Sequence, residues 1–131
     1  MNGAISRSRF LGFAGLIALA VGGIALGAPE ALLASKGIVA DAAASVWMRE
    51  VGAALVSIGF IIWRIRNEPD SLPMLAILWG GAVLNGLLLP IEIWAYADGT
   101  IRNLAGIIPN SVLHVVLGIG FLNYAFSASR T

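Results

Sequence analysis

Hydrophobic positions dominate four long stretches of the chain, and polar positions gather between them. The stretches cover about residues 10–28, 44–63, 72–97 and 105–126. About twenty apolar residues are enough for a helix to cross the roughly 30 Å hydrocarbon core of a bilayer. The stretches are continuously apolar and lack the period-two alternation of a membrane β-barrel. The pattern therefore predicts an all-α protein, an antiparallel bundle of four transmembrane helices that forms a single membrane domain over residues 1–131.

Composition supports a membrane protein and narrows its chemistry. Hydrophobic residues make up 59% of the chain and charged residues only 11%, about half the charged share of a soluble domain. A formal net charge of +1 argues against binding nucleic acid, so we expect the lipid bilayer as the partner. The chain has no Cys and one His, which excludes disulfide scaffolds, thiolate chemistry and bis-His haem. We therefore expect neither a metal nor a cofactor.

Residues 30–45, between the first two stretches, are too weakly hydrophobic to span and too hydrophobic for a free loop. They predict a short amphipathic connector that lies in the interface or forms a lid over the bundle mouth. Gly37 would interrupt a helix here, and Asp41 would cap the second span. An ordinary ordered connector is the alternative.

Basic residues are unevenly distributed between the two sides of the predicted bundle. The side of the termini would carry Arg7, Arg9, Arg64, Arg66 and Arg130, and the opposite side Lys36, Arg49 and Arg102. Because cytoplasmic loops are enriched in Lys and Arg, we expect both termini in the cytoplasm, with the chain in a bacterial inner membrane. The first stretch is longer than the apolar core of a typical signal peptide, so we expect a retained signal-anchor helix.

Small residues spaced four apart indicate where transmembrane helices approach closely. Two such pairs are Gly23 with Gly27 and Ala82 with Gly86. In a chain with sixteen glycines such pairs also arise by chance, so they favour close packing without identifying the partner helix.

Four ionisable side chains interrupt the spans, although each costs at least ~2.5–3.5 kcal/mol near the bilayer centre. Arg49 and Glu50 come early in the second span, Glu92 late in the third and His114 early in the fourth. All four therefore fall in the outer half of the predicted bundle. Helical spacing gives each of these three helices one polar face. The second span carries Glu50 and Ser57 on it, the third Asn85 and Glu92, and the fourth Asn110, Ser111 and His114. Burying these faces against one another would be the least costly arrangement.

These polar faces predict a pocket in the outer half of the bundle that binds a small lipophilic molecule. Acid–base chemistry in it, such as isomerisation, cyclisation or epoxide opening, would use Glu50, Glu92 and His114, because burial tunes such groups toward proton transfer. Substrate binding and orientation would fall to a second set of side chains: Arg49, Asn85, Asn110, Trp47 and Trp94.

A structural role for the same residues is the main alternative. Arg49 would pair with Glu92, and His114 would donate to a backbone carbonyl. The chain would then be a non-catalytic accessory subunit of a larger membrane complex, with the polar cluster fixing helix register. A third hypothesis, proton-coupled transport, would require a homodimer to form the pathway.

The order of features over residues 12–60 resembles the first half of DoxX-like small four-helix membrane proteins. An apolar span is followed by Pro29-Glu30, a short amphipathic piece and then Met48-Arg49-Glu50-Val51-Gly52 at the head of an Ala/Leu/Gly-rich span. Arg49 and Gly52 carry the likeness, and the second half of the chain matches in span count. The resemblance implies a four-helix fold. Some members accompany quinone-linked oxidoreductases, but the resemblance implies little specific chemistry for this chain. It assigns no role to Glu92 or His114.

Overall fold

The computed structural model describes residues 6–129, which form five α-helices and, within that range, no strand. The helices are α1 (Arg7–Gly27), α2 (Pro29–Ser35), α3 (Ala42–Ile65), α4 (Leu72–Ala97) and α5 (Leu104–Ala128). All but α2 are long and apolar enough to cross a membrane, and they cover the four stretches predicted as spans. The all-α prediction and the four membrane-length helices are therefore confirmed. Arg130, part of the predicted charge bias, lies outside the described residues.

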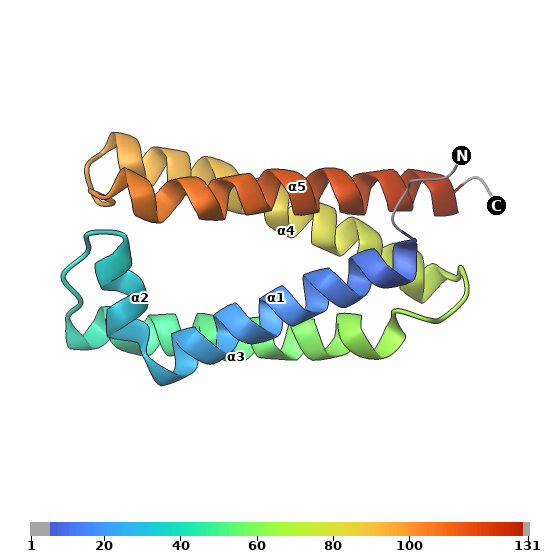
Figure 1. Cartoon of the computed structure of the whole chain (residues 1–131), viewed down its shortest axis with the longest axis horizontal. Coiled ribbons are helices and arrows are strands. Elements are labelled where there is room, and N and C mark those ends of the chain that lie inside the picture. The colour runs from blue at the N-terminus through green and yellow to red at the C-terminus, as the bar shows by residue number, and fades with distance from the viewer. Residues whose placement is uncertain (1–5, 130–131) are drawn as a thin grey trace.

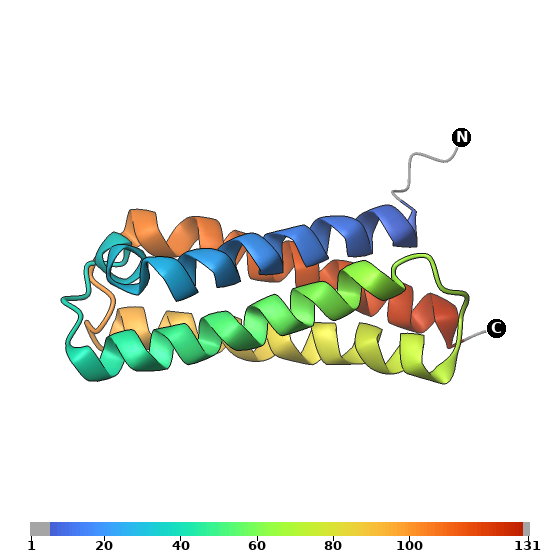
Figure 2. The same ribbon diagram turned by 90° about the horizontal axis from the view of Figure 1, so that it is seen from below.

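The long helices associate as two pairs. Figure 1 shows α1 beside α3 and α4 beside α5, and Figure 2 shows the same elements from below. We call the end that holds α2 and residues 98–103 the lid end, and the end where α1 begins and α5 ends the termini end. The two pairs touch mainly near the termini end, through α1 and α5.

Glycines set the close contact between α1 and α3. A Cβ atom built on Gly22 would lie 2.8 Å from the carbonyl oxygen of Gly52, and one on Gly59 would lie 2.8 Å from that of Gly15. Both obstacles are backbone atoms, so a side chain at either position would push the two helices apart. The two helices therefore meet through glycines spaced seven residues apart on each of them.

The predicted packing positions Gly23, Gly27 and Gly86 do not serve this purpose. A Cβ atom at any of the three would meet nothing within 4 Å. In α1 the glycines that pack are Gly15 and Gly22. Gly22 is one position before Gly23, and one position corresponds to a rotation of about 100° around the helix. The prediction for these glycines is wrong for that reason.

Side chains from distant parts of the chain close the termini end. The ring of Phe10 packs edge-on against Phe121, with the centroids 5.0 Å apart, and against Tyr124 at 5.2 Å. Arg7 forms an ion pair with Asp70 and donates to the carbonyl of Glu68 at 2.6 Å. The first turn of α1 is thereby fixed to α5 and to the α3–α4 loop.

Backbone hydrogen bonds close the lid end. The chain leaves α2 through Gly37, whose φ of +76° is a left-handed conformation that favours glycine. The carbonyl of Lys36 then accepts from the backbone N–H groups of Arg102 and Asn103 at 3.0 and 3.2 Å. The Asp41 carboxylate accepts from the N–H of Ala44 at 2.7 Å and caps α3. Both the interruption at Gly37 and the Asp41 cap agree with the sequence analysis.

Candidate functional site: a cavity with one polar end

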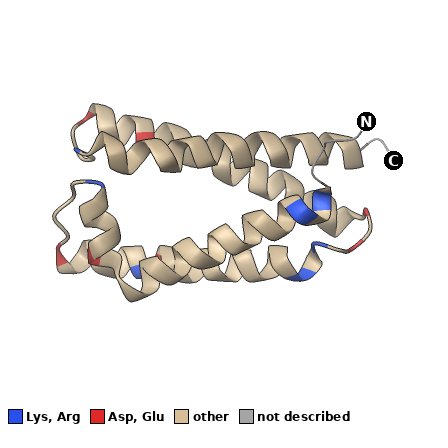
Figure 3. Cartoon of the chain, viewed as in Figure 1, with Lys and Arg blue, Asp and Glu red and all other residues tan. Residues whose placement is uncertain are grey.

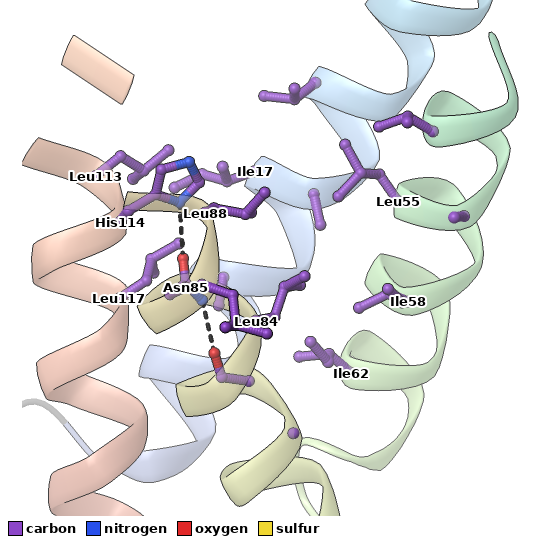
Figure 4. Close-up of a pocket in the computed structure, with 18 of the residues that line it drawn as sticks. Ile17, Leu55, Ile58, Ile62, Leu84, Asn85, Leu88, Leu113, His114 and Leu117 are labelled. Atoms are coloured by element: carbon purple, nitrogen blue, oxygen red, sulfur yellow. Dashed lines mark hydrogen bonds between the residues drawn. The ribbon is translucent and has the colours of Figure 1, made fainter. Parts of the chain in front are cut away.

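A cavity of about 820 Å³ lies between the α1–α3 pair and the α4–α5 pair. Aliphatic side chains form most of its wall, among them Ile17, Leu55, Ile58 and Leu84 (Figure 4). Its polar lining side chains all lie toward the lid end or halfway along the bundle: Lys36, Asn85, Glu92, Asn110 and His114. Together with Ser111, these residues form what we call the polar cluster. The cavity wall is thus mostly apolar, and its polar side chains lie in the half toward the lid end.

Glu92 is the buried anion of the polar cluster. Its side chain is only 10% exposed, and its Oε1 atom accepts from Lys36 Nζ at 2.8 Å and from Asn110 Nδ2. Its Oε2 atom accepts from the Ser111 hydroxyl at 3.1 Å. The carboxylate therefore has a counter-ion and two further donors, which offset the loss of its hydration.

His114 continues the cluster toward the middle of the bundle. Asn85 Nδ2 donates to the backbone carbonyl of Gly81 at 2.8 Å, so Asn85 Oδ1 faces His114 Nδ1, 3.0 Å away, as an acceptor (Figure 4). His114 Nδ1 then carries the proton, because an amide oxygen cannot donate. The other ring nitrogen, Nε2, accepts from Asn110 Nδ2 at 3.2 Å. The hydrogen-bond network assigns His114 as the neutral Nδ1–H tautomer.

Helical spacing explains why four of these side chains meet. Asn85 and Glu92 stand seven residues apart on α4, and Asn110 and His114 four apart on α5, so each pair shares one helix face. The sequence analysis predicted this convergence, and the structure brings all four together. Asn85 lies about 18 Å along the axis from the end of α4, so the cluster reaches from the lid end to the helix midpoint.

The cavity opens sideways between α3 and α4. Its lining residues on α1, α2 and α5 are buried or half-buried. The exposed lining residues all belong to α3 and α4: Val51, Ala54, Ile61, Ala76, Gly80, Val83 and Leu87. Exposure at the rim marks an opening, which we call the lateral mouth.

Glu50 and Arg49 do not join the polar cluster, and the prediction that they lie in the pocket is wrong. Both are exposed and neither lines the cavity. The cavity face of α3 carries Met48 and Val51 instead, and Glu50 points about 100° away from Val51. Arg49 lies 3.6 Å from Glu30, so the predicted Arg49–Glu92 pair is wrong as well. A backbone hydrogen bond, the Ser45 hydroxyl and the charge of Arg49 hold the pKa of Glu30 below its usual value.

Trp47 and Trp94, predicted to bind substrate, also lie outside the cavity. Their exposed fractions are 67% and 74%, and neither side chain lines the cavity wall. Both stand near helix ends at the lid end. An indole ring there suits the boundary between lipid headgroups and hydrocarbon, where its apolar body and its N–H are both accommodated.

Lys36 is the cluster residue that the sequence analysis missed. The sequence pattern places it in the connector between the first two spans and predicts no partner for it in the bundle. One signal points to it: the pattern predicts the connector as a lid over the bundle mouth, and Lys36 is the cation in its central part. A lid that covers a buried carboxylate needs such a charge, because an unpaired buried ion is costly.

Two further observations bear on the site. Among residues 6–129, no group of three or more His, Cys, Asp or Glu side chains has the arrangement to hold a metal ion. Comparisons with protein-family models, with curated proteins and with solved structures find no match to this chain.

Proposed function

We propose that this chain is an integral membrane protein that binds a small lipophilic molecule in the cavity between its two helix pairs. The observation that carries the proposal is the cavity itself. Its volume of about 820 Å³ falls within the range of ligand pockets, roughly 300–1,000 Å³. Its long apolar wall suits a hydrocarbon body, and the polar cluster suits the polar group of the same molecule.

The position of the mouth supports a ligand that arrives from the bilayer. The exposed rim residues Val83 and Leu87 are more than half exposed and aliphatic, as expected of a helix flank that faces lipid. Both ends of the bundle are closed by contacts, through Arg7 and Asp70 at one end and Lys36 and Asn103 at the other. A lipophilic molecule would therefore reach the cavity from the hydrocarbon without crossing water.

The same proposal places the helices as an antiparallel transmembrane bundle, with α2 as an interfacial lid on the outer side of a bacterial inner membrane. Figure 3 supports it, because it shows basic residues at both ends and most of the acidic residues at the lid end. Among residues 6–129 the termini end holds four arginines and two acids, and the lid end three basic residues and five acids. This bias favours cytoplasmic termini. The DoxX-like resemblance agrees with a four-helix bundle and remains a proposal.

Acid–base chemistry on the ligand is the further step of the proposal. Because Glu50 and Arg49 lie outside the cavity, proton transfer would fall to Glu92 and His114, with Asn85 and Asn110 orienting the ligand. His114 Nε2 carries an unprotonated lone pair, which is what a general base needs. Isomerisation, cyclisation and epoxide opening are the reactions that these groups would serve without a cofactor.

The test is to identify lipophilic molecules that co-purify with the protein and to ask whether they occupy the cavity. Ala18 lines the cavity, and Ala20, on the same helix, is exposed and does not line it. The variant Ala18→Phe would fill part of the cavity, and Ala20→Phe is the matched control of equal size and hydrophobicity. Solvent extracts of all three purified proteins are compared by mass spectrometry.

We expect one lipophilic species to co-purify with the wild type and Ala20→Phe and to be lost from Ala18→Phe. The same extract from all three proteins, containing bulk membrane lipid alone, would contradict the proposal. That result would instead favour the accessory-subunit hypothesis, in which the polar cluster fixes helix register and a larger complex is the partner.

A further inference from the structure

The contact between Asn110 and His114 is the longest hydrogen bond of the polar cluster, and we call it the link. Asn110 Nδ2 lies 3.2 Å from His114 Nε2, at the long end of the range for hydrogen bonds donated by nitrogen. The other contacts of the two side chains, to Glu92 and to Asn85 at 3.0 Å, are shorter. Both side chains line the cavity, so a ligand group that displaces this contact would meet both of them.

A group inserted at this link must replace two hydrogen-bonding functions. It has to accept from the N–H of Asn110 and donate to the lone pair on His114 Nε2, or one of the two stays buried without a partner. A hydroxyl does both with a single oxygen atom, whereas an ether or a ketone only accepts. A buried acceptor deprived of its donor costs about 1–3 kcal/mol, which corresponds to a loss of affinity of roughly 5-fold to 150-fold.

The charges around the link disfavour an anionic head group. Among residues 6–129, Lys36 is the one cationic side chain that lines the cavity, and it is already paired with Glu92 at 2.8 Å. A ligand carboxylate would add a second negative charge beside Glu92 without a free counter-ion. The cluster is therefore suited to a neutral polar group.

We propose that the ligand is a lipophilic alcohol whose hydroxyl lies between Asn110 and His114 and whose hydrocarbon chain extends along the wall formed by α3 and α4. This inference rests on the proposed function and names the chemical class of the ligand. His114 Nε2 accepts the proton of the hydroxyl in a hydrogen bond, and Asn110 donates to its oxygen. The preference for an alcohol then depends on both residues.

The experiment measures saturable binding of tritiated dodecanol to the immobilised full-length protein by scintillation proximity. Dodecyl methyl ether and dodecanoate serve as competitors, because they share its hydrocarbon chain and differ in the head group. His114→Leu and Asn110→Ala remove the two sides of the link. Ser57→Ala is the matched control, because Ser57 is an exposed hydroxyl residue within α3 that bonds to the Ala53 carbonyl of its own helix.

We expect dodecanol to bind the wild type and Ser57→Ala about tenfold more tightly than the ether, with dodecanoate weaker than dodecanol. Both link variants should lose this preference while still binding the ether. Equal binding of ether and alcohol by the wild type, tighter binding of dodecanoate, or a preference that survives in folded link variants would overturn the inference. If the variants do not fold, the comparison of the three compounds on the wild type decides.

The outcomes separate this inference from the proposed function. Tight binding of ether or dodecanoate leaves the cavity as a lipophile site and removes only the alcohol preference. Absence of saturable binding by all three compounds overturns the alcohol inference. The proposed function fails with it only if no lipophilic species co-purifies with the wild type.

Discussion

Lys36, in the turn that follows α2, forms an ion pair of 2.8 Å with Glu92 of α4, and the two side chains are only 15% and 10% exposed. The pair joins residues 56 positions apart in the sequence and connects the turn after α2 to the polar end of the cavity. A second ion pair at the lid end, Arg49 with Glu30, is 3.6 Å long, with both side chains about half exposed. The two ion pairs allow a matched test of how burial changes the contribution of an ion pair to the free energy of unfolding.

Lys36→Met should destabilise the protein strongly because it leaves the Glu92 carboxylate buried without its counter-ion. The expected loss in the free energy of unfolding is about 3 kcal/mol or more, as for other broken buried pairs. Arg49→Met should cost less than about 1 kcal/mol, because exposed pairs contribute little. Unfolding titrations in mixed micelles measure both. Adding Glu92→Gln to Lys36→Met should restore part of the lost free energy of unfolding. Equal losses for the two single variants would contradict a stabilising buried ion pair between Lys36 and Glu92.

Gly52→Ala should weaken the contact between α1 and α3. Its Cβ would lie 2.8 Å from the backbone nitrogen of Leu26 and 2.9 Å from the carbonyl oxygen of Gly22, so the helices must separate, at a cost of about 1–3 kcal/mol. Gly23→Ala is the control, since a Cβ there meets nothing and alanine favours a helix over glycine. Thermal unfolding in detergent should rank Gly52→Ala below the wild type and Gly23→Ala at or above it. The reverse order would exclude this packing.

Gly80→Phe should slow ligand entry by narrowing the lateral mouth. Gly80 is an exposed cavity-lining residue of α4, and Gly86 is an exposed glycine of the same helix that does not line the cavity. A Cβ at either position meets no atom within 4 Å, so both variants should fold. In nanodiscs, tritiated dodecanol should associate severalfold more slowly with Gly80→Phe than with Gly86→Phe or the wild type. Identical association rates would place the entrance elsewhere.

His114 should be observed as a neutral imidazole protonated at Nδ1. The Asn85 oxygen can only accept from it, because the Asn85 amide nitrogen donates to Gly81. Nitrogen NMR of histidine-labelled protein should show one protonated and one unprotonated ring nitrogen, and Asn85→Leu should change the tautomer balance. The opposite tautomer in the wild type would contradict the hydrogen-bond directions on which the alcohol preference depends.

Single cysteines test the membrane orientation, because the chain has none of its own. Thr100 lies in the α4–α5 loop at the lid end, and Glu68 in the α3–α4 loop at the termini end, and both are exposed. In intact cells a membrane-impermeant maleimide should label Thr100→Cys, and it should label Glu68→Cys only after permeabilisation. The opposite pattern would place the termini outside.

Much of the fold was predictable from the sequence because it depends on local patterns. Apolar length predicted the four long helices, and Asp41 predicted the start of α3. The spacing of Asn85 with Glu92 and of Asn110 with His114 predicted one polar face on each helix, and burial cost predicted that these faces meet. Such features depend on one helix at a time, or on a single strong free-energy term.

The rest of the site was not predictable because it depends on helix rotation and on the lid. Arg49 and Glu50 lie close enough to the start of α3 for long side chains to reach polar surroundings, so burial cost does not force them inward. The apolar residues Met48 and Val51 decide which face of α3 meets the cavity. Lys36 reaches Glu92 because Gly37 turns the chain against the α4–α5 loop. The hydrophobic periodicity of the sequence does not predict this contact between the two loops.

The most direct test of the central claim is photo-crosslinking from within the cavity in native membranes. Benzoylphenylalanine would replace Leu84, which lines the cavity, or Ile93, an exposed residue of the same helix that does not. At Leu84 we predict an adduct with one lipophilic molecule of a single mass, lost when Ala18→Phe is added, and at Ile93 a mixture of bulk lipids. The same mixture at both positions would contradict a specific ligand in the cavity.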